Sequence, residues 1–123
     1  MTVGQRGLEA PKVIAKDISL AATDTTAEID LNGGTLVGVS IPELTSTSFT
    51  IEVASATGGT FRTARDGFGL YGTEDTDISV AIGTTSVGYY PIPKEITYGM
   101  QFARLVFSAS ETATITVFYR SVE

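Results

Sequence analysis

The sequence contains no cysteine and no histidine. Without cysteine the chain can form no disulfide, no thiolate nucleophile and no sulfur-bound zinc site. Without histidine it lacks the commonest general base and the commonest neutral metal ligand. Most hydrolase constellations are therefore excluded, and we expect no enzyme activity, no cofactor and no metal.

Basic residues are also few, with 8 Lys and Arg against 14 Asp and Glu, so the net charge is −6 at pH 7. They are scattered along the chain and form no stripe that could neutralise successive phosphates, which argues against nucleic acid as a partner. No apolar run approaches the roughly 18 residues of a membrane span, and residues 1–6 lack the apolar block of a signal peptide. We expect a soluble, unexported chain with no membrane partner.

The length of 123 residues fits one domain, because domains cluster at about 100 to 150 residues. Apolar residues make up 42% of the chain, which is enough to fill a core. Residues 1–11 contain Gly4, Gly7 and Pro11 and little apolar material, so nothing predicts that they fold alone. We predict an N-terminal arm over residues 1–11, which orders on a partner or stays mobile, and one domain over residues 12–123.

Thr, Ser and Gly together make up 42 of the 123 residues, a composition typical of a sheet protein with tight turns. Alternation of apolar and polar residues is clearest over residues 48–54, where Phe49, Ile51 and Val53 share one face. Such a period of two predicts a half-buried strand.

Residues 114–120 repeat this alternation, and Phe118 on their polar face indicates a second contact surface. Further runs rich in β-branched and aromatic residues span 13–20, 27–31, 35–41, 60–65, 78–82, 87–92 and 102–108. Turn signals separate these runs, at 32–34, 57–59, 66–67, 83–85 and 110–112. Because a single sheet would leave one apolar face in water, we predict an all-β fold, an antiparallel two-sheet β-sandwich that is jelly-roll-like.

The densest polar cluster lies in a predicted loop over residues 66–77, which carries four carboxylates: Asp66, Glu74, Asp75 and Asp77. Calcium takes six to eight oxygen ligands, so an ion site is one interpretation of this loop. The spacing does not match an EF-hand, and a solvated acidic loop is the interpretation we favour.

The same loop displays Phe68, Leu70 and Tyr71 between glycines. Aromatic residues on surface loops are enriched where proteins meet, so these three residues are candidates for a protein contact. The alternative is that they fold back under the loop and cap one end of the sandwich.

Three tyrosines, Tyr89, Tyr90 and Tyr98, could stack on sugar rings as lectin platforms do. The neighbouring Pro91 and Pro93 favour a packed corner instead. The sequence therefore leaves a carbohydrate platform open as the less favoured interpretation.

Carboxylates that could serve as a catalytic pair include Asp30 and Glu52. Both lie on presumed outward strand positions, where a solvated, charged face is the expected role. No catalytic pair stands out, and no histidine could activate the abundant serines and threonines.

The order of strand and turn blocks resembles small β-sandwich virion proteins of tailed bacteriophages, especially head decoration or cement proteins. The blocks that carry the likeness are residues 34–42, 49–55, 58–61, 88–92, 102–108 and 114–120. The resemblance implies a structural, non-enzymatic virion protein, made in the host cytoplasm, that binds the major capsid protein on the assembled capsid surface. It also implies a homo-oligomer, with a trimer favoured.

In such an assembly the arm could add a strand to a neighbour's sheet edge, with Val13, Ile14 and Ile18 as anchors. Head or tail location stays open. The alternative function is a carbohydrate- or receptor-binding β-sandwich module, such as a tail or fibre component.

Overall fold

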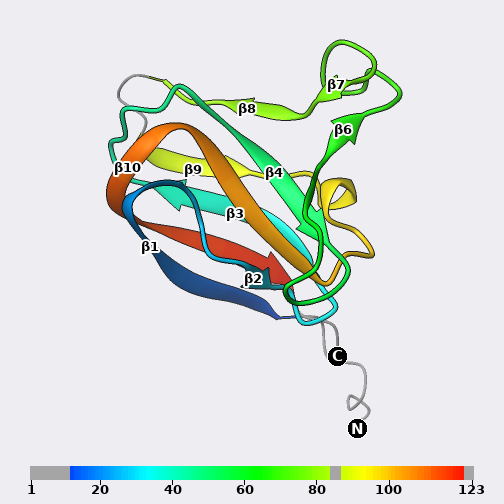
Figure 1. Cartoon of the computed structure of the whole chain (residues 1–123), viewed down its shortest axis with the longest axis horizontal. Coiled ribbons are helices and arrows are strands. Elements are labelled where there is room, and N and C mark those ends of the chain that lie inside the picture. The colour runs from blue at the N-terminus through cyan, green and yellow to red at the C-terminus, as the bar shows by residue number, and fades with distance from the viewer. Residues whose placement is uncertain (1–11, 84–86, 121–123) are drawn as a thin grey trace, which may run out of the picture.

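The computed structural model describes residues 12–83 and 87–120 (Figure 1). The predicted arm over residues 1–11 lies outside the described residues. The described elements are β1 (Val13–Thr25), β2 (Ile29–Asp30), β3 (Thr35–Ile41), β4 (Ser48–Ala54), β5 (Arg62–Thr63), β6 (Arg65–Asp66), β7 (Thr76–Asp77), β8 (Ser79–Ala81), β9 (Gly88–Pro91), the 3₁₀ turn η1 (Lys94–Ile96) and β10 (Phe102–Arg120). Within this part of the chain, no helix is long and apolar enough to cross a membrane.

The strands form antiparallel, strongly curled β structure, which confirms the all-β antiparallel prediction (Figure 1). The long strand β10 lies at the centre. Its first half pairs with β4 and β2, and its second half pairs with β3. β1 pairs with the second half and again, at Val106, with the first half. Outside these, β9 pairs with β3, while β5 and β8 pair with β4. One continuous strand therefore connects most of the fold.

The turn predicted over residues 110–112 is wrong, because β10 runs through this segment without interruption. The strand bends here, as Figure 1 shows, but β1 remains paired with it on both sides of the bend. The side chain of Glu111 does not bond its own backbone, as a turn residue would, but reaches a loop elsewhere in the sequence.

Glu111 is a buried acidic residue that holds the loop before β4 against the bend of β10. Its Oε2 accepts hydrogen bonds from the Ser46 N–H at 2.7 Å and the Thr45 N–H at 3.1 Å, and it lies 2.5 Å from the Ser46 hydroxyl. Burial by itself raises the pKa of Glu111, but the hydrogen bonds from Ser46 and Thr45 outweigh it and hold the pKa below its ordinary value. The carboxylate is therefore charged in the folded protein at neutral pH.

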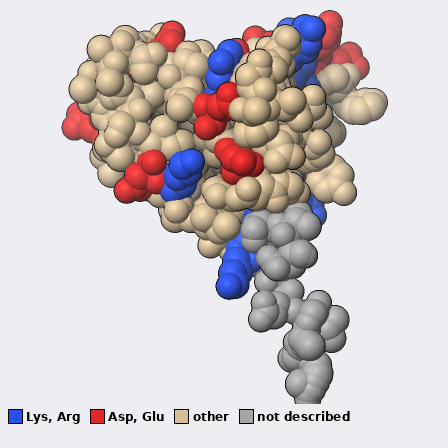
Figure 2. Space-filling model, turned by 60° about the horizontal axis from the view of Figure 1, so that its bottom comes forward, with Lys and Arg blue, Asp and Glu red and all other residues tan. Residues whose placement is uncertain are grey.

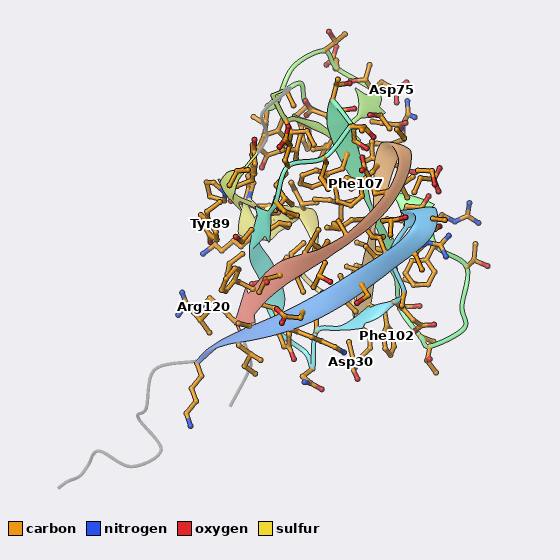
Figure 3. The ribbon with its side chains drawn as sticks, turned by 90° about the vertical axis from the view of Figure 1, so that its left-hand side faces the viewer. Asp30, Asp75, Tyr89, Phe102, Phe107 and Arg120 are labelled. Atoms are coloured by element: carbon orange, nitrogen blue, oxygen red, sulfur yellow. The ribbon has the colours of Figure 1, made fainter. Side chains whose placement is uncertain are left out.

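The core follows the predicted alternation. Phe49 and Ile51 of β4 are buried, and Leu105 and Phe107 of β10 are buried opposite them. The rings of Phe49 and Phe107 lie 5.4 Å apart, and Figure 3 shows Phe107 among the interior side chains. The second half of β10 adds three more buried residues, Ile115, Val117 and Tyr119. Period-two placement in β4 and β10 thus supplies much of the core.

The strand predicted over residues 60–65 leaves the main sheet after Thr63. β5 ends there, and β6 begins a separate two-stranded ribbon with β7, in which Arg65 pairs with Asp77 and Asp66 with Thr76. Figure 1 shows this ribbon projecting from the curled sheet. The ribbon carries the acidic loop away from the sheet.

Candidate functional site

A surface hollow of about 380 Å³ lies between the ribbon loop and the segment that follows β9. Apolar residues from several elements line it, and the most buried of them are Ile78 and Ile96, which are 7% and 9% exposed. Three charged residues also contribute to the lining: Arg65, Asp66 and Glu95. The hollow therefore combines an apolar base with charged groups.

Four of the lining residues, Phe68, Leu70, Tyr71 and Tyr98, are large, apolar and exposed. Phe68 is 87% exposed and Leu70 is 73% exposed, so neither side chain folds back to cap the sheet. The structure brings the three predicted contact residues of the loop together with Tyr98, which the sequence had placed in a different context. Contiguous exposed apolar side chains of this kind mark interaction sites.

The side chain of Asp66 determines the shape of this loop. Asp66 is only 4% exposed, and its carboxylate accepts hydrogen bonds from the backbone N–H groups of Leu70 at 2.8 Å and Tyr71 at 2.7 Å. Gly69 lies inside the turn so formed, with a φ of 73° that favours glycine. The loop is therefore held in one shape by its own residues, and Phe68 within it is exposed.

Arg65 neutralises part of the acidic loop. Its guanidinium lies 2.9 Å from the Asp77 carboxylate and 3.3 Å from that of Asp75, which Figure 3 labels on the ribbon. All three side chains are at least half exposed, so these pairs add about 0 to 1 kcal/mol of stability. Within the described ranges, no group of three or more acidic residues lies close enough to hold a metal ion. Three of the four carboxylates considered as calcium ligands, Asp66, Asp75 and Asp77, thus bond to residues of the ribbon and its loop.

Glu95, in η1, is an exposed acidic residue that lines the hollow and joins no ion pair within the part of the chain that the structure describes. Partial desolvation raises the pKa of Tyr71, and the negative charges of Glu95 and Asp66 raise it further. The Tyr71 hydroxyl is therefore neutral over the physiological range. Glu95 and Tyr98 also line an adjacent hollow of about 360 Å³ together with Lys94.

The predicted anchor residues of β1 lie apart from this hollow. Val13 is 60% exposed, Ile14 packs partly buried against the core, and Ile18 is 7% exposed within the core. Among the three, only Val13 is largely exposed.

The other tyrosines do not join Tyr98. The ring of Tyr89 packs edge-on against Phe118 with the centroids 5.5 Å apart, and a Cβ at Gly38 would collide with the Tyr89 hydroxyl. Figure 3 shows Tyr89 on the outside of the sheet. Tyr90 is partly buried against the core. The three tyrosines considered for a sugar platform therefore do not share one surface.

The carboxylates considered for catalysis each have a local partner. Asp30 accepts a hydrogen bond from the Asn32 N–H at 2.9 Å. Glu52 pairs with Arg104 at 2.6 Å, and the Arg104 guanidinium lies 4.3 Å from the centre of the Phe61 ring. Both carboxylates thus take part in local structural contacts.

Glu95 is a site residue that could not be predicted from the sequence. Its neighbours carry no motif, and its closeness to the loop arises only when η1 folds beside the ribbon. On the face shown in Figure 2, basic side chains stand apart from one another and form no continuous basic area. The charge pattern of that face therefore does not indicate a ligand.

Comparison with protein-family models, with curated proteins and with solved structures finds no match to this chain. The class that the fold and the site define is an antiparallel β protein with an exposed aromatic hollow.

Proposed function

We propose that this chain is a non-catalytic structural protein of a virus particle, which binds the major capsid protein on the assembled capsid surface and stabilises the shell. The observation that carries the proposal is the set of four exposed apolar side chains around one hollow: Phe68, Leu70, Tyr71 and Tyr98. The resemblance of the strand blocks to phage decoration proteins supports the choice of a capsid as the partner.

Exposure of these apolar side chains to water is unfavourable, and their burial against a partner lowers the free energy. Burial of an apolar side chain contributes about 1.5 to 3 kcal/mol, and aromatic residues dominate the energy of protein interfaces. The Asp66 carboxylate already holds the loop in shape, so binding loses little conformational entropy there. The loop that carries Phe68, Leu70 and Tyr71 is thus preorganised for binding a protein partner.

The proposal includes a homo-oligomer, with a trimer favoured. Within the described residues, β1 pairs only with β10, so one edge of this 13-residue strand is open to strand addition. Several copies arranged about an axis would bind the shell together and gain avidity. The N-terminal arm that would add the strand lies outside the described residues.

The proposal also includes the finer fold assignment, a jelly-roll-like two-sheet sandwich. The bend in β10 would carry this strand from one sheet to the other. The support is that inward residues on both sides of the bend, such as Leu105 and Ile115, are fully buried.

The test uses particles of the virus that encodes the chain, prepared from a deletion mutant that lacks it. Purified protein is added, and co-sedimentation and the temperature of genome release are measured. We expect saturable binding and a higher release temperature. The Phe68→Ser/Leu70→Ser double variant should bind at least tenfold more weakly, whereas Val87→Ser, which removes an exposed apolar side chain outside the hollow, should bind normally. Mass spectrometry that fails to find the chain in wild-type particles would contradict the proposal.

A carbohydrate- or receptor-binding module is the second candidate. The observation that favours it is that Tyr71, Tyr98 and Glu95 line one hollow, since sugar sites combine aromatic faces with carboxylate acceptors. Glycan-array binding that is lost in Tyr98→Ala would promote this candidate over the first.

A further inference from the structure

We propose that the aromatic hollow receives a basic side chain, arginine before lysine, from the surface of the protein partner. The inference rests on the proposed function, because it assumes that the hollow is a protein contact. It adds the chemistry by which the hollow would select its partner: a cation held between aromatic rings and a carboxylate.

The chain already contains this arrangement once, within its own structure. The Arg104 guanidinium lies over the Phe61 ring at 4.3 Å and pairs with the Glu52 carboxylate at 2.6 Å. A planar cation attracted by the electron-rich face of a ring and by an acid is a stable combination at a partly exposed site. Ring, carboxylate and cation are all present there.

The hollow contains aromatic rings and a carboxylate, but the cation in its lining is already paired with other residues. Phe68, Tyr71 and Tyr98 supply exposed rings, and Glu95 supplies a carboxylate that joins no ion pair among the described residues. The cation in the lining, Arg65, is held by two aspartates of the ribbon.

The remaining charges around the hollow also favour a basic ligand. Asp66 adds a second carboxylate to the lining, and its partners are uncharged N–H groups, which leave its negative charge in place. Lys94 lines the adjacent hollow, not this one. With a net charge of −6 for the whole chain, a basic partner surface would be attracted from a distance.

The size of the hollow agrees with a side chain as the ligand. Its volume of about 380 Å³ is near the lower end of the range for ligand pockets, about 300 to 1,000 Å³. The aliphatic stem of an arginine could cover the apolar base formed by Ile78 and Ile96 while its guanidinium meets Glu95.

The experiment is an NMR titration of the full chain with two matched peptides, acetyl-Gly-Arg-Gly-amide and its citrulline analogue. Citrulline has the shape of arginine without the charge. We expect amide shifts confined to residues 65–71 and 94–100, and binding of the arginine peptide about fivefold tighter than that of the citrulline peptide, the size typical of a partly exposed charge contact. The preference should weaken at high salt.

Variants locate the effect. Glu95→Gln should remove most of the preference for arginine, while Glu43→Gln, an exposed acid that lines neither hollow, should keep it. Equal binding of both peptides, shifts spread over the whole chain, or an unchanged preference in Glu95→Gln would overturn the inference. Tyr98-dependent glycan binding in place of peptide binding would overturn it as well.

The particle experiment separates this inference from the proposed function. If Glu95→Gln binds particles as well as wild type while Phe68→Ser/Leu70→Ser does not, the basic ligand is refuted and the capsid role stands. If the chain is absent from purified particles, the capsid role fails whatever the peptides do.

Discussion

Replacement of Glu111 by alanine should destabilise the protein more than any change of an exposed acid. The carboxylate satisfies the backbone N–H of Ser46, a residue that is 1% exposed. A buried donor left without an acceptor costs about 1 to 3 kcal/mol, and the hydroxyl contact and the lost packing add to this. We expect Glu111→Ala to lower the free energy of unfolding by about 3 kcal/mol.

The glutamine variant is the matched control for shape. Its side-chain oxygen can occupy the place of Oε2 and accept from the Ser46 N–H, so the variant loses the charge and the 3.3 Å contact from the Thr45 N–H to Oε1. Glu111→Gln should therefore cost about 1 kcal/mol, and the exposed Glu43→Ala less than about 0.5 kcal/mol. Urea unfolding measures all three. If Glu111→Ala unfolds within 0.5 kcal/mol of wild type, the carboxylate does not hold the loop as described.

The pH dependence of stability follows from the lowered pKa of Glu111. A carboxyl group whose pKa is lower in the folded state stabilises the protein above its unfolded pKa, near the ordinary value of 4.5, and loses this contribution as the pH falls through the folded value. The stability difference between wild type and Glu111→Gln should therefore be full at pH 7 and shrink below about pH 4.5. A difference that stays constant down to pH 2 would refute the hydrogen-bonded, charged state.

Three other substitutions test local geometry. The Cβ of Gly34→Ala would collide with the backbone oxygen of Arg120, so we expect a loss of folded protein by circular dichroism. Gly67→Ala meets open space and should leave the melting temperature unchanged. Asp66→Asn keeps one acceptor for the N–H groups of the loop and loses the charge; chymotrypsin should then cleave after Phe68 several-fold faster, and equal cleavage rates would show that Asp66 does not shape the loop.

Local pattern predicted the strands that are regular and short. The segments 35–41 and 48–54 coincide with β3 and β4, because their alternation reflects which face is buried. The turn prediction for residues 110–112 was wrong, because Ser-Glu-Thr favours a turn only when its side chains bond to nearby backbone groups. The acceptor role of Glu111 depends on a loop that is 65 residues away in the sequence.

The candidate site was predictable only in part. The exposed aromatic loop followed from Phe68, Leu70 and Tyr71 standing between glycines and charges. Glu95 and Tyr98 could not be assigned to the same place, because the hollow exists only where η1 lies against the ribbon. Spatial neighbours from separate segments leave no periodic signal in one sequence.

The central position of β10 has a consequence for how the chain acquires its structure. β1, β2, β3 and β4 all take backbone partners from residues 102–120, which the ribosome makes after them. Until those residues emerge, four strands have open ladders, so folding is dominated by non-local pairing and should be slow, on the order of milliseconds to seconds. Amides of β10 should exchange with solvent only through global unfolding, and the nascent chain before residue 102 should depend on chaperones to stay unaggregated.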